Sequence, residues 1–286
     1  MNVATAPPPA ELRDITGPSA FGGGWTRFLR LTWLISVTDF KLGYLGTFLG
    51  YLWSLMRPVL LFGVYYIVFT KVFRFGGITD YPVLLLMNIM LYTFFADATL
   101  RAVTSVAAQE GVVRKMQFPR IVIPLSVVLT SAFNMCLNLL AVLIFMAIYG
   151  IHPMWTWLLF PLILIPLAVL TTAVSMILSA CYVRFRDVAQ IWTVLATAIF
   201  YGAPILYGIE TVASQPKLQT VINWNPLSPL LEQARVWIVD PSAPNALEAV
   251  GNQWTKLLIP AGIALVVCVF ALWIFNREAP RIAEEL

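Results

Sequence analysis

The stretch Leu45–Phe73, LGTFLGYLWSLMRPVLLFGVYYIVFTKVF, predicts where this chain enters a membrane. From Pro58 to the end of the stretch, the only charged residue is Lys71. Counted from Tyr51, the segment of low charge exceeds the roughly 20 residues that a helix needs to cross a hydrocarbon core of ~30 Å. Proline costs no hydrogen bond in the first turn of a helix, so we expect Pro58 near the start of a transmembrane helix.

The composition of the whole chain is typical of a membrane protein. Of its 286 residues, 60% are hydrophobic and 11% are charged, whereas a soluble domain carries about 25% charged residues. The net charge of +4 is too small to indicate a nucleic-acid partner. With one histidine and three isolated cysteines, the chain lacks the residues for a His-based metal cluster or a Ser/His triad.

The chain before the first span divides into a tail and a helix. Residues 1–23 are rich in proline, glycine and small polar residues, which predicts a flexible cytoplasmic tail. Between residues 25 and 42, apolar residues recur at helical spacing with charged residues between them. We expect an interfacial helix on the cytoplasmic membrane surface. An ordinary soluble amphipathic helix is less favoured, because the chain enters lipid a few residues later.

Hydropathy predicts an all-α integral membrane protein with six transmembrane helices in one domain, residues 24–280. The connection 207–255 is rich in proline and asparagine, and its apolar pieces are too short to cross, so we expect re-entrant or surface helices there. Residues 276–286 form a charged cytoplasmic tail. The six spans are expected at about 51–73, 82–100, 121–149, 157–182, 188–206 and 256–275.

The distribution of basic residues predicts the orientation. Six spans place both termini on one side, and 13 of the 18 lysines and arginines fall on that side. The other five are spread over longer sequence. Because short cytoplasmic loops are enriched in lysine and arginine, both termini are expected in the cytoplasm.

The sequence contains no energy-coupling machinery of its own. It has no G-x-x-x-x-G-K-[ST] motif for binding nucleotide phosphates. Asp97, with Arg101 one turn later, is the main ionisable residue in the spans, so the relay of acidic residues or histidines typical of proton-coupled transport is missing. Uphill transport would therefore draw its energy from another chain.

A cytoplasmic connection, residues 101–120, offers a docking place for such a chain. Glu110 and Arg114 are one turn apart, and Val112, Val113 and Met116 add an apolar surface. This pattern predicts a short amphipathic helix suited to a groove on a soluble partner. A solvated, positively charged loop explains the same residues equally well. The charge cluster 184–187 is a weaker signal of the same kind.

Four motifs, in their order and spacing, resemble the ABC-type polysaccharide export permeases. These are the membrane subunits that export O-antigen, teichoic acid and related cell-wall glycans. The resemblance covers about residues 25–280. The motifs are Leu49-Gly50-x-x-Trp53-x-x-x-x-Pro58, RKMQFPR at 114–120, YVRFRDV at 182–188, and NPLSP at 225–229 with Arg235 downstream.

The resemblance implies a homodimer of six-span subunits in the bacterial plasma membrane, each bound to a separate P-loop ATPase. ATP and Mg then belong to that partner, and this chain has no cofactor and no catalytic residue. The segment Glu110–Arg120 corresponds to the coupling helix that receives the ATPase stroke. The residues expected to couple are Glu110, Arg114, Lys115, Phe118, Arg120, Arg184, Arg186 and Asp187.

A polysaccharide needs a tunnel that binds weakly and repeatedly, and aromatic rings can stack on the apolar faces of sugars. The alternative for each aromatic residue is packing against lipid or another helix. Tyr65 and Tyr66 are favoured for the tunnel because phenolic hydroxyl groups at mid-membrane depth need partners or water. The candidate channel residues are Tyr51, Trp53, Phe62, Tyr65, Tyr66, Phe69 and Phe73.

Arg57 is a candidate for binding a lipid-linked pyrophosphate at the cytoplasmic mouth, because a guanidinium group suits phosphate. Snorkelling to membrane phosphates is the simpler explanation of the same residue.

We therefore predict the channel-forming subunit of an ATP-driven exporter that moves a lipid-linked polysaccharide out of the cytoplasm. One alternative is an ABC permease that exports a small drug or lipid. An integral membrane glycosyltransferase is a second, although it would need an acidic active site and a metal or nucleotide-sugar site. A non-transporting membrane scaffold is a third.

Overall fold

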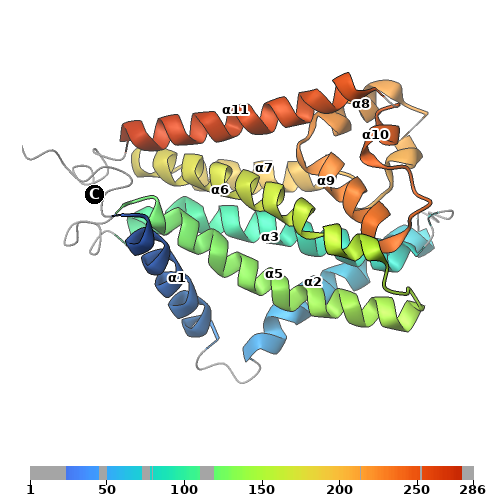
Figure 1. Ribbon diagram of the computed structural model, residues 1–286, viewed down its shortest axis with the longest axis horizontal. Coiled ribbons are helices and arrows are strands. Elements are labelled where there is room, and N and C mark those ends of the chain that lie inside the picture. The colour runs from blue at the N-terminus through green and yellow to red at the C-terminus, as the bar shows by residue number, and fades with distance from the viewer. Residues whose placement is uncertain are drawn as a thin grey trace, which may run out of the picture.

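The computed structural model describes residues 24–44, 50–72, 78, 80–109, 119–212, 214–251 and 253–278. Within these ranges all regular secondary structure is helical. The long helices form a bundle along the longest axis of the molecule, with α3 in its middle (Figure 1). The tails 1–23 and 279–286 lie outside the described residues, as do Phe73, Glu110, Arg114, Lys115 and Phe118.

Five helical segments are long and apolar enough to cross a membrane. Each overlaps one of the predicted spans, which confirms an all-helical chain with several apolar helices of membrane-spanning length. The segments are α2 (Gly50–Ile67) continued by the π-helical turn η1 (Val68–Val72), α3 (Tyr81–Ala108), α5 (Val122–Tyr149), η2 (Trp155–Leu159) with α6 (Pro161–Arg184), and α11 (Trp254–Glu278).

The helix α3 forms the centre of the bundle. It packs against α5, α6, α2 and α7. In an apolar stretch of 18 residues, 78% of the residues of α3 are buried, compared with 11% in the equivalent stretches of α2 with η1 and of α11. A helix that is apolar on all sides is stable only when other helices or lipid surround it. The outer faces of α2 and α11 are therefore free to contact lipid or another chain.

The place of one proline and the end of one helix differ from those predicted. Pro58 lies inside α2, eight residues after its first residue, and not in the first turn. Its ring cannot donate a backbone hydrogen bond, so one carbonyl group of the preceding turn loses its helical partner. The helix α3 continues to Ala108, beyond the predicted end at residue 100, because Ala102, Val103 and Val106 are buried.

The fifth predicted span is shorter than expected. The helix α7 (Val188–Tyr201) has 14 residues, which corresponds to a length of about 21 Å. The chain then turns through Gly202 and Pro204 instead of remaining helical to residue 206. Six full spans therefore stay a prediction.

The first helix, α1 (Trp25–Leu42), has the predicted bounds and packs against α5 through small polar residues. The Ser36 hydroxyl group donates a hydrogen bond to the Ser126 carbonyl oxygen at 3.0 Å. The Thr130 hydroxyl group donates to the Ser36 carbonyl oxygen at 3.2 Å. Small side chains allow the two backbones to approach closely, so this contact fixes α1 on the bundle.

The connection between α7 and α11 folds into short helices at one end of the bundle, opposite the end where α11 finishes (Figure 1). In chain order they are η3 (Ile209–Val212), α8 (Pro216–Trp224), α9 (Leu227–Ala234), η4 (Arg235–Val239) and α10 (Ala246–Ala249). Among them, η4 packs against α3, α9 against α6, and α8 against α11.

Candidate functional site

A polar cavity of about 570 Å³ opens between α1, α2, α3 and α5. Its charged lining comes from Asp39, Arg57, Asp97 and Arg101. The Arg57 guanidinium group lies 3.8 Å from the Asp97 carboxylate, and the two side chains are 71% and 32% exposed. This ion pair joins α2 to α3. Arg101, one turn after Asp97 on α3, lines the same cavity.

The amide side chains of α5 complete this cavity. The Tyr44 hydroxyl group donates a hydrogen bond to Asn134, and Asn138 lines the cavity one turn further along α5. The Asn138 side-chain oxygen is buried and accepts no hydrogen bond from the residues that the structure describes. Polar groups of this kind usually find partners, so the cavity is suited to a polar occupant or to water.

A second cavity, of about 260 Å³, lies between α2, α3 and α7; we call it the aromatic groove. Four aromatic residues line it: Tyr65, Tyr92, Phe200 and Tyr201. The Phe200 ring lies 5.4 Å from Tyr65, 5.1 Å from Tyr92 and 5.2 Å from Tyr201, measured between ring centroids. These spacings are those of interacting aromatic pairs, so the rings form one continuous cluster.

Hydroxyl groups accompany the rings. Thr193 and Thr197 are exposed on α7 and line the groove, each donating its hydroxyl proton to a carbonyl oxygen one turn earlier. Their oxygen atoms keep acceptor capacity. The groove thus offers aromatic faces together with hydrogen-bond acceptors, which matches the two kinds of surface that a sugar ring presents.

The two cavities meet at the ion pair, because Arg57, Pro58, Thr93 and Asp97 line both. A polar cavity and an aromatic groove therefore follow one another along the same side of α2 and α3.

The predicted channel residues fall on different faces of α2. Tyr65 lines the groove, and Trp53 lines the polar cavity with 62% of its surface exposed. Phe62 is only 7% exposed, stacks on Tyr66 and meets Phe145 of α5 edge-on at 5.3 Å.

Phe69 is partly buried against the same hydrophobic core as Tyr66. The side chain of Tyr51 is not among those that the structure describes. Successive helical residues are rotated by about 100°, so Tyr65 and Tyr66 cannot share one face.

Sequence reasoning missed Tyr92, Phe200 and Tyr201. Each is an ordinary aromatic residue of an apolar helix, where packing is the commoner role. Only the pairing of α3 with α7 brings the three beside Tyr65.

Comparison with known proteins agrees with this architecture. A family model described as "ABC-2 type transporter" matches residues 30–239. The chain belongs to the ABC-2 type transporter family. It is similar to the O-antigen export system permease protein RfbA of Klebsiella pneumoniae, with 30% identity over 254 residues that cover 88% of this chain and 93% of the relative. RfbA of Myxococcus xanthus is 28% identical over 248 residues, covering 87% of this chain and 92% of the relative.

One end of this ABC-2 transporter family member carries a group of charged side chains. Arg184, Arg186 and Asp187, at the junction of α6 and α7, are all exposed. The Arg184 guanidinium group lies over the Phe185 ring at 5.4 Å. Arg120, directly before α5, is only 9% exposed. The three exposed residues are accessible to a partner, whereas Arg120 belongs mainly to the bundle.

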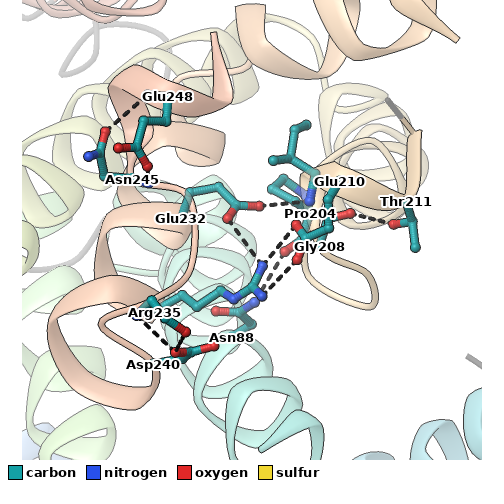
Figure 2. A network of polar contacts seen from close by, with 12 residues as sticks. Asn88, Pro204, Gly208, Glu210, Thr211, Glu232, Arg235, Asp240, Asn245 and Glu248 are labelled. Carbon is teal, nitrogen blue, oxygen red and sulfur yellow. Dashed lines mark hydrogen bonds and ion pairs between the residues drawn. The ribbon is translucent and has the colours of Figure 1, made fainter. Parts of the chain in front are cut away.

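The opposite end holds a buried ionic cluster, shown in Figure 2. Arg235 of η4 contacts Glu210 of η3 through both terminal nitrogens, at 2.7 and 2.9 Å. Its guanidinium group also lies 3.8 Å from the Glu232 carboxylate of α9. Arg235 and Glu232 are each 4% exposed, and Glu210 is 39% exposed. The sequence motif had singled out Arg235 but neither glutamate.

The cluster sets the ionisation of its members. Burial raises the pKa of Glu232 to about 7, although Arg235 and the backbone N–H of Ile209 partly offset this. Partial burial alone would raise the pKa of Glu210, but the hydrogen bond from Arg235 outweighs it and lowers that pKa below its usual value. Glu210 is therefore the ionised partner of Arg235, and Glu232 titrates near neutrality.

Hydrogen bonds join this cluster region to the aromatic groove. Asn88 of α3 donates to the Pro204 carbonyl oxygen at 3.1 Å, and the Tyr207 hydroxyl group donates to the Tyr201 carbonyl oxygen at 3.2 Å. The turn that follows α7 is thereby tied to α3 and to the last residue of α7. A side chain at Gly208 would reach within 2.5 Å of the Glu210 carboxylate, so the ion pair requires glycine there.

Proposed function

We propose that this chain is the membrane subunit of an ATP-driven exporter that moves a lipid-linked polysaccharide from the cytoplasm across the plasma membrane. The observation that carries the proposal is the aromatic groove with its hydroxyl groups, in an ABC-2 family member similar to two O-antigen export permeases. A groove for a hydrophobic drug would not need the polar cavity that precedes it.

The glycan enters through the polar cavity and continues along the aromatic groove. Arg57, which is largely exposed where the two cavities meet, binds the lipid-linked pyrophosphate. Trp53 and Tyr65 then stack on sugar rings, as does Tyr201 of α7, which is 55% exposed. We place Tyr51 and Phe73 at the two ends of this path and assign Phe62, Tyr66 and Phe69 to its supporting wall.

The chain crosses the membrane six times, with α7 as the short fifth span, in one domain of residues 24–280. The helix α1 lies at the cytoplasmic surface, and α8 and α9 are re-entrant from the outer side. Both termini face the cytoplasm, because the exposed arginines between α6 and α7 lie at the same end as the end of α11.

Two kinds of partner complete the exporter. A second copy of the chain covers the exposed apolar side beside the groove, where Val64 of α2 is 59% exposed and Val194 of α7 is 70% exposed. A P-loop ATPase carries ATP and Mg and docks on the cytoplasmic end. The docking residues are Glu110, Arg114, Lys115, Phe118, Arg184, Arg186 and Asp187, with Arg120 holding the segment to the bundle.

The test is purification of the tagged chain in mild detergent together with assay of glycan at the cell surface. We expect a P-loop ATPase in equal amount, and its loss when residues 114–120 are scrambled. Scrambling residues 279–286 instead is the control and should leave the ATPase bound. Purification without any ATPase, from cells that still insert the chain, would contradict the proposal.

A further inference from the structure

We infer that the groove takes an uncharged glycan, and that Asp97 disfavours polymers whose repeat carries carboxylate or phosphate groups. This inference rests on the proposed function and names the substrate class of the same site.

The lining of the groove carries no surplus of positive charge. Among the residues that the structure describes, Arg57 and Asp97 are the charged side chains that line it, and they are paired with each other. The remaining polar groups are threonine and tyrosine hydroxyls. A polymer with an anion in every repeat would leave each charge without a counterion here, and the burial of an unpaired anion is costly.

The place of Asp97 makes it the deciding residue. It lies where the polar cavity joins the groove, so each sugar must pass its carboxylate. The basic groups that face it are Arg57 and Arg101. Arg57 is much more exposed than Asp97, so it can turn towards a pyrophosphate in the mouth. Once it does, Arg101 is the cation that still faces Asp97, but Arg101 lines the polar cavity and not the groove. On the groove side, the Asp97 carboxylate therefore repels anionic repeats.

The outer end of the path adds to this selection. Among the residues that the structure describes, Glu210, Glu232 and Asp240 act on Arg235, which is committed to Glu210. This acidic cluster follows directly on the turn after Tyr201. An anionic polymer that leaves the groove would therefore meet a surplus of negative charge.

Two other basic residues at the outer end, Lys71 and Lys256, add no positive charge to the groove. Lys71 is exposed on η1 and does not line either cavity. Lys256 lines a separate cavity between α8, α10 and α11 together with Glu248.

The test uses the complete complex with its ATPase in lipid nanodiscs and two lipid-linked glycans of equal length. One has a glucose repeat, and in the other every second glucose is replaced by glucuronate. At low ionic strength we expect the neutral glycan to bind about tenfold more tightly, as a nearby like charge at moderate screening predicts. High salt should reduce the difference, because the charges are partly exposed.

Two variants locate the effect. Asp97→Asn keeps the shape of the side chain. It frees Arg57 equally for the pyrophosphate of both glycans, so we read its effect from the ratio of the two affinities, which we expect to narrow to about threefold or less. Thr193→Lys, which adds a cation to the groove, should act in the same direction. Asp80→Asn is the matched control, because Asp80 starts α3 outside the groove with a left-handed backbone that asparagine also adopts. It should keep the full preference.

The outcomes separate the inference from the proposed function. Equal binding of the two glycans, or tighter binding of the anionic one, would overturn the inference and leave export intact. A neutral preference that Asp97→Asn does not change would overturn the role of Asp97. If neither glycan binds to an assembled complex, the proposed function fails and the inference fails with it.

Discussion

Arg235 and Glu210 form a two-pronged ion pair, with nitrogen–oxygen distances of 2.7 and 2.9 Å, that joins η4 to η3 across 25 residues of sequence. A guanidinium group binds a carboxylate in this geometry through two parallel hydrogen bonds. Because Arg235 is 4% exposed, the pair fixes the turn after α7 from the inside of the fold.

Replacement of this cation should destabilise the end of the bundle that holds the short helices. Arg235→Met leaves Glu232 buried and Glu210 unpaired, and removal of one partner of a buried ion pair costs on the order of 3 kcal/mol. We expect a clearly lower melting temperature in detergent, followed by tryptophan fluorescence. Arg235→Lys keeps the charge but loses the two parallel hydrogen bonds of the guanidinium group. Its melting temperature should lie between those of the native chain and Arg235→Met. Arg186→Met, the same change at an exposed arginine, should leave the melting temperature unchanged.

Stability should fall as pH rises towards neutrality. The pKa of Glu232 is about 7 in the folded chain, against an ordinary value of 4.5. Between pH 4.5 and pH 7, Glu232 therefore holds a proton in the folded state that it has lost in the unfolded state. Its stabilising effect is complete below pH 4.5 and is lost as pH rises through 7. Melting temperatures measured from pH 5 to pH 8 should decline for the native chain and decline much less for Glu232→Gln.

Glu210 changes the stability of the fold with pH in the opposite direction to Glu232. Its pKa is lowered by Arg235, so its contribution is present above the ordinary pKa of glutamate and is lost as pH falls below that value. A melting temperature that rises from pH 5 to pH 8 would show that Glu232 does not control this range.

The membrane class of the chain and most of its helices could be predicted from the sequence, because the length and apolar composition of a helix are local properties. It predicted the bounds of α1 and, to within a few residues, those of α5 and α11. It failed at Pro58 and at the end of α7. At the end of α7 the following residues stay apolar, so hydropathy does not record that the helix stops sooner. At Pro58 the charged Arg57 before it resembles the edge of a span, yet the chain is already helical there.

The site was less predictable because it depends on contacts between distant helices. The stripe Phe62–Tyr66–Phe69 has regular helical spacing, yet this face packs on α5 and the core. Tyr65, one residue away, faces α7. Periodicity identifies residues that share a face, but it cannot say whether that face meets protein or an open groove.

The pair Tyr65 and Tyr66 gives a direct test of the groove. Tyr65→Ala removes a ring from the groove, and we expect surface glycan to fall roughly tenfold, which corresponds to about 1.4 kcal/mol of lost stacking. The amount of protein in the membrane and its ATPase partner should not change. Tyr65→Phe keeps the ring and should retain most of the export.

Tyr66→Ala separates packing from transport. Because Tyr66 stacks on the buried Phe62 ring, its loss should lower the melting temperature while the export per assembled complex stays close to normal. Both quantities can be measured in the same membranes. If Tyr66→Ala abolishes export from stable complexes and Tyr65→Ala does not, the path runs along the other face of α2.

The contact between α1 and α5 should tolerate no larger side chain at Ser36. This residue is fully buried against Ser126 and Thr130, so Ser36→Leu forces the two helices apart at a cost of about 1–3 kcal/mol. We expect α1 to become sensitive to protease in intact membranes while the rest of the bundle stays resistant. Thr38→Leu places the same side chain on the exposed face of α1 and should leave the protease resistance unchanged. If Ser36→Leu is as resistant as the native chain, these hydrogen bonds do not hold α1 in place, and its position must come from the membrane.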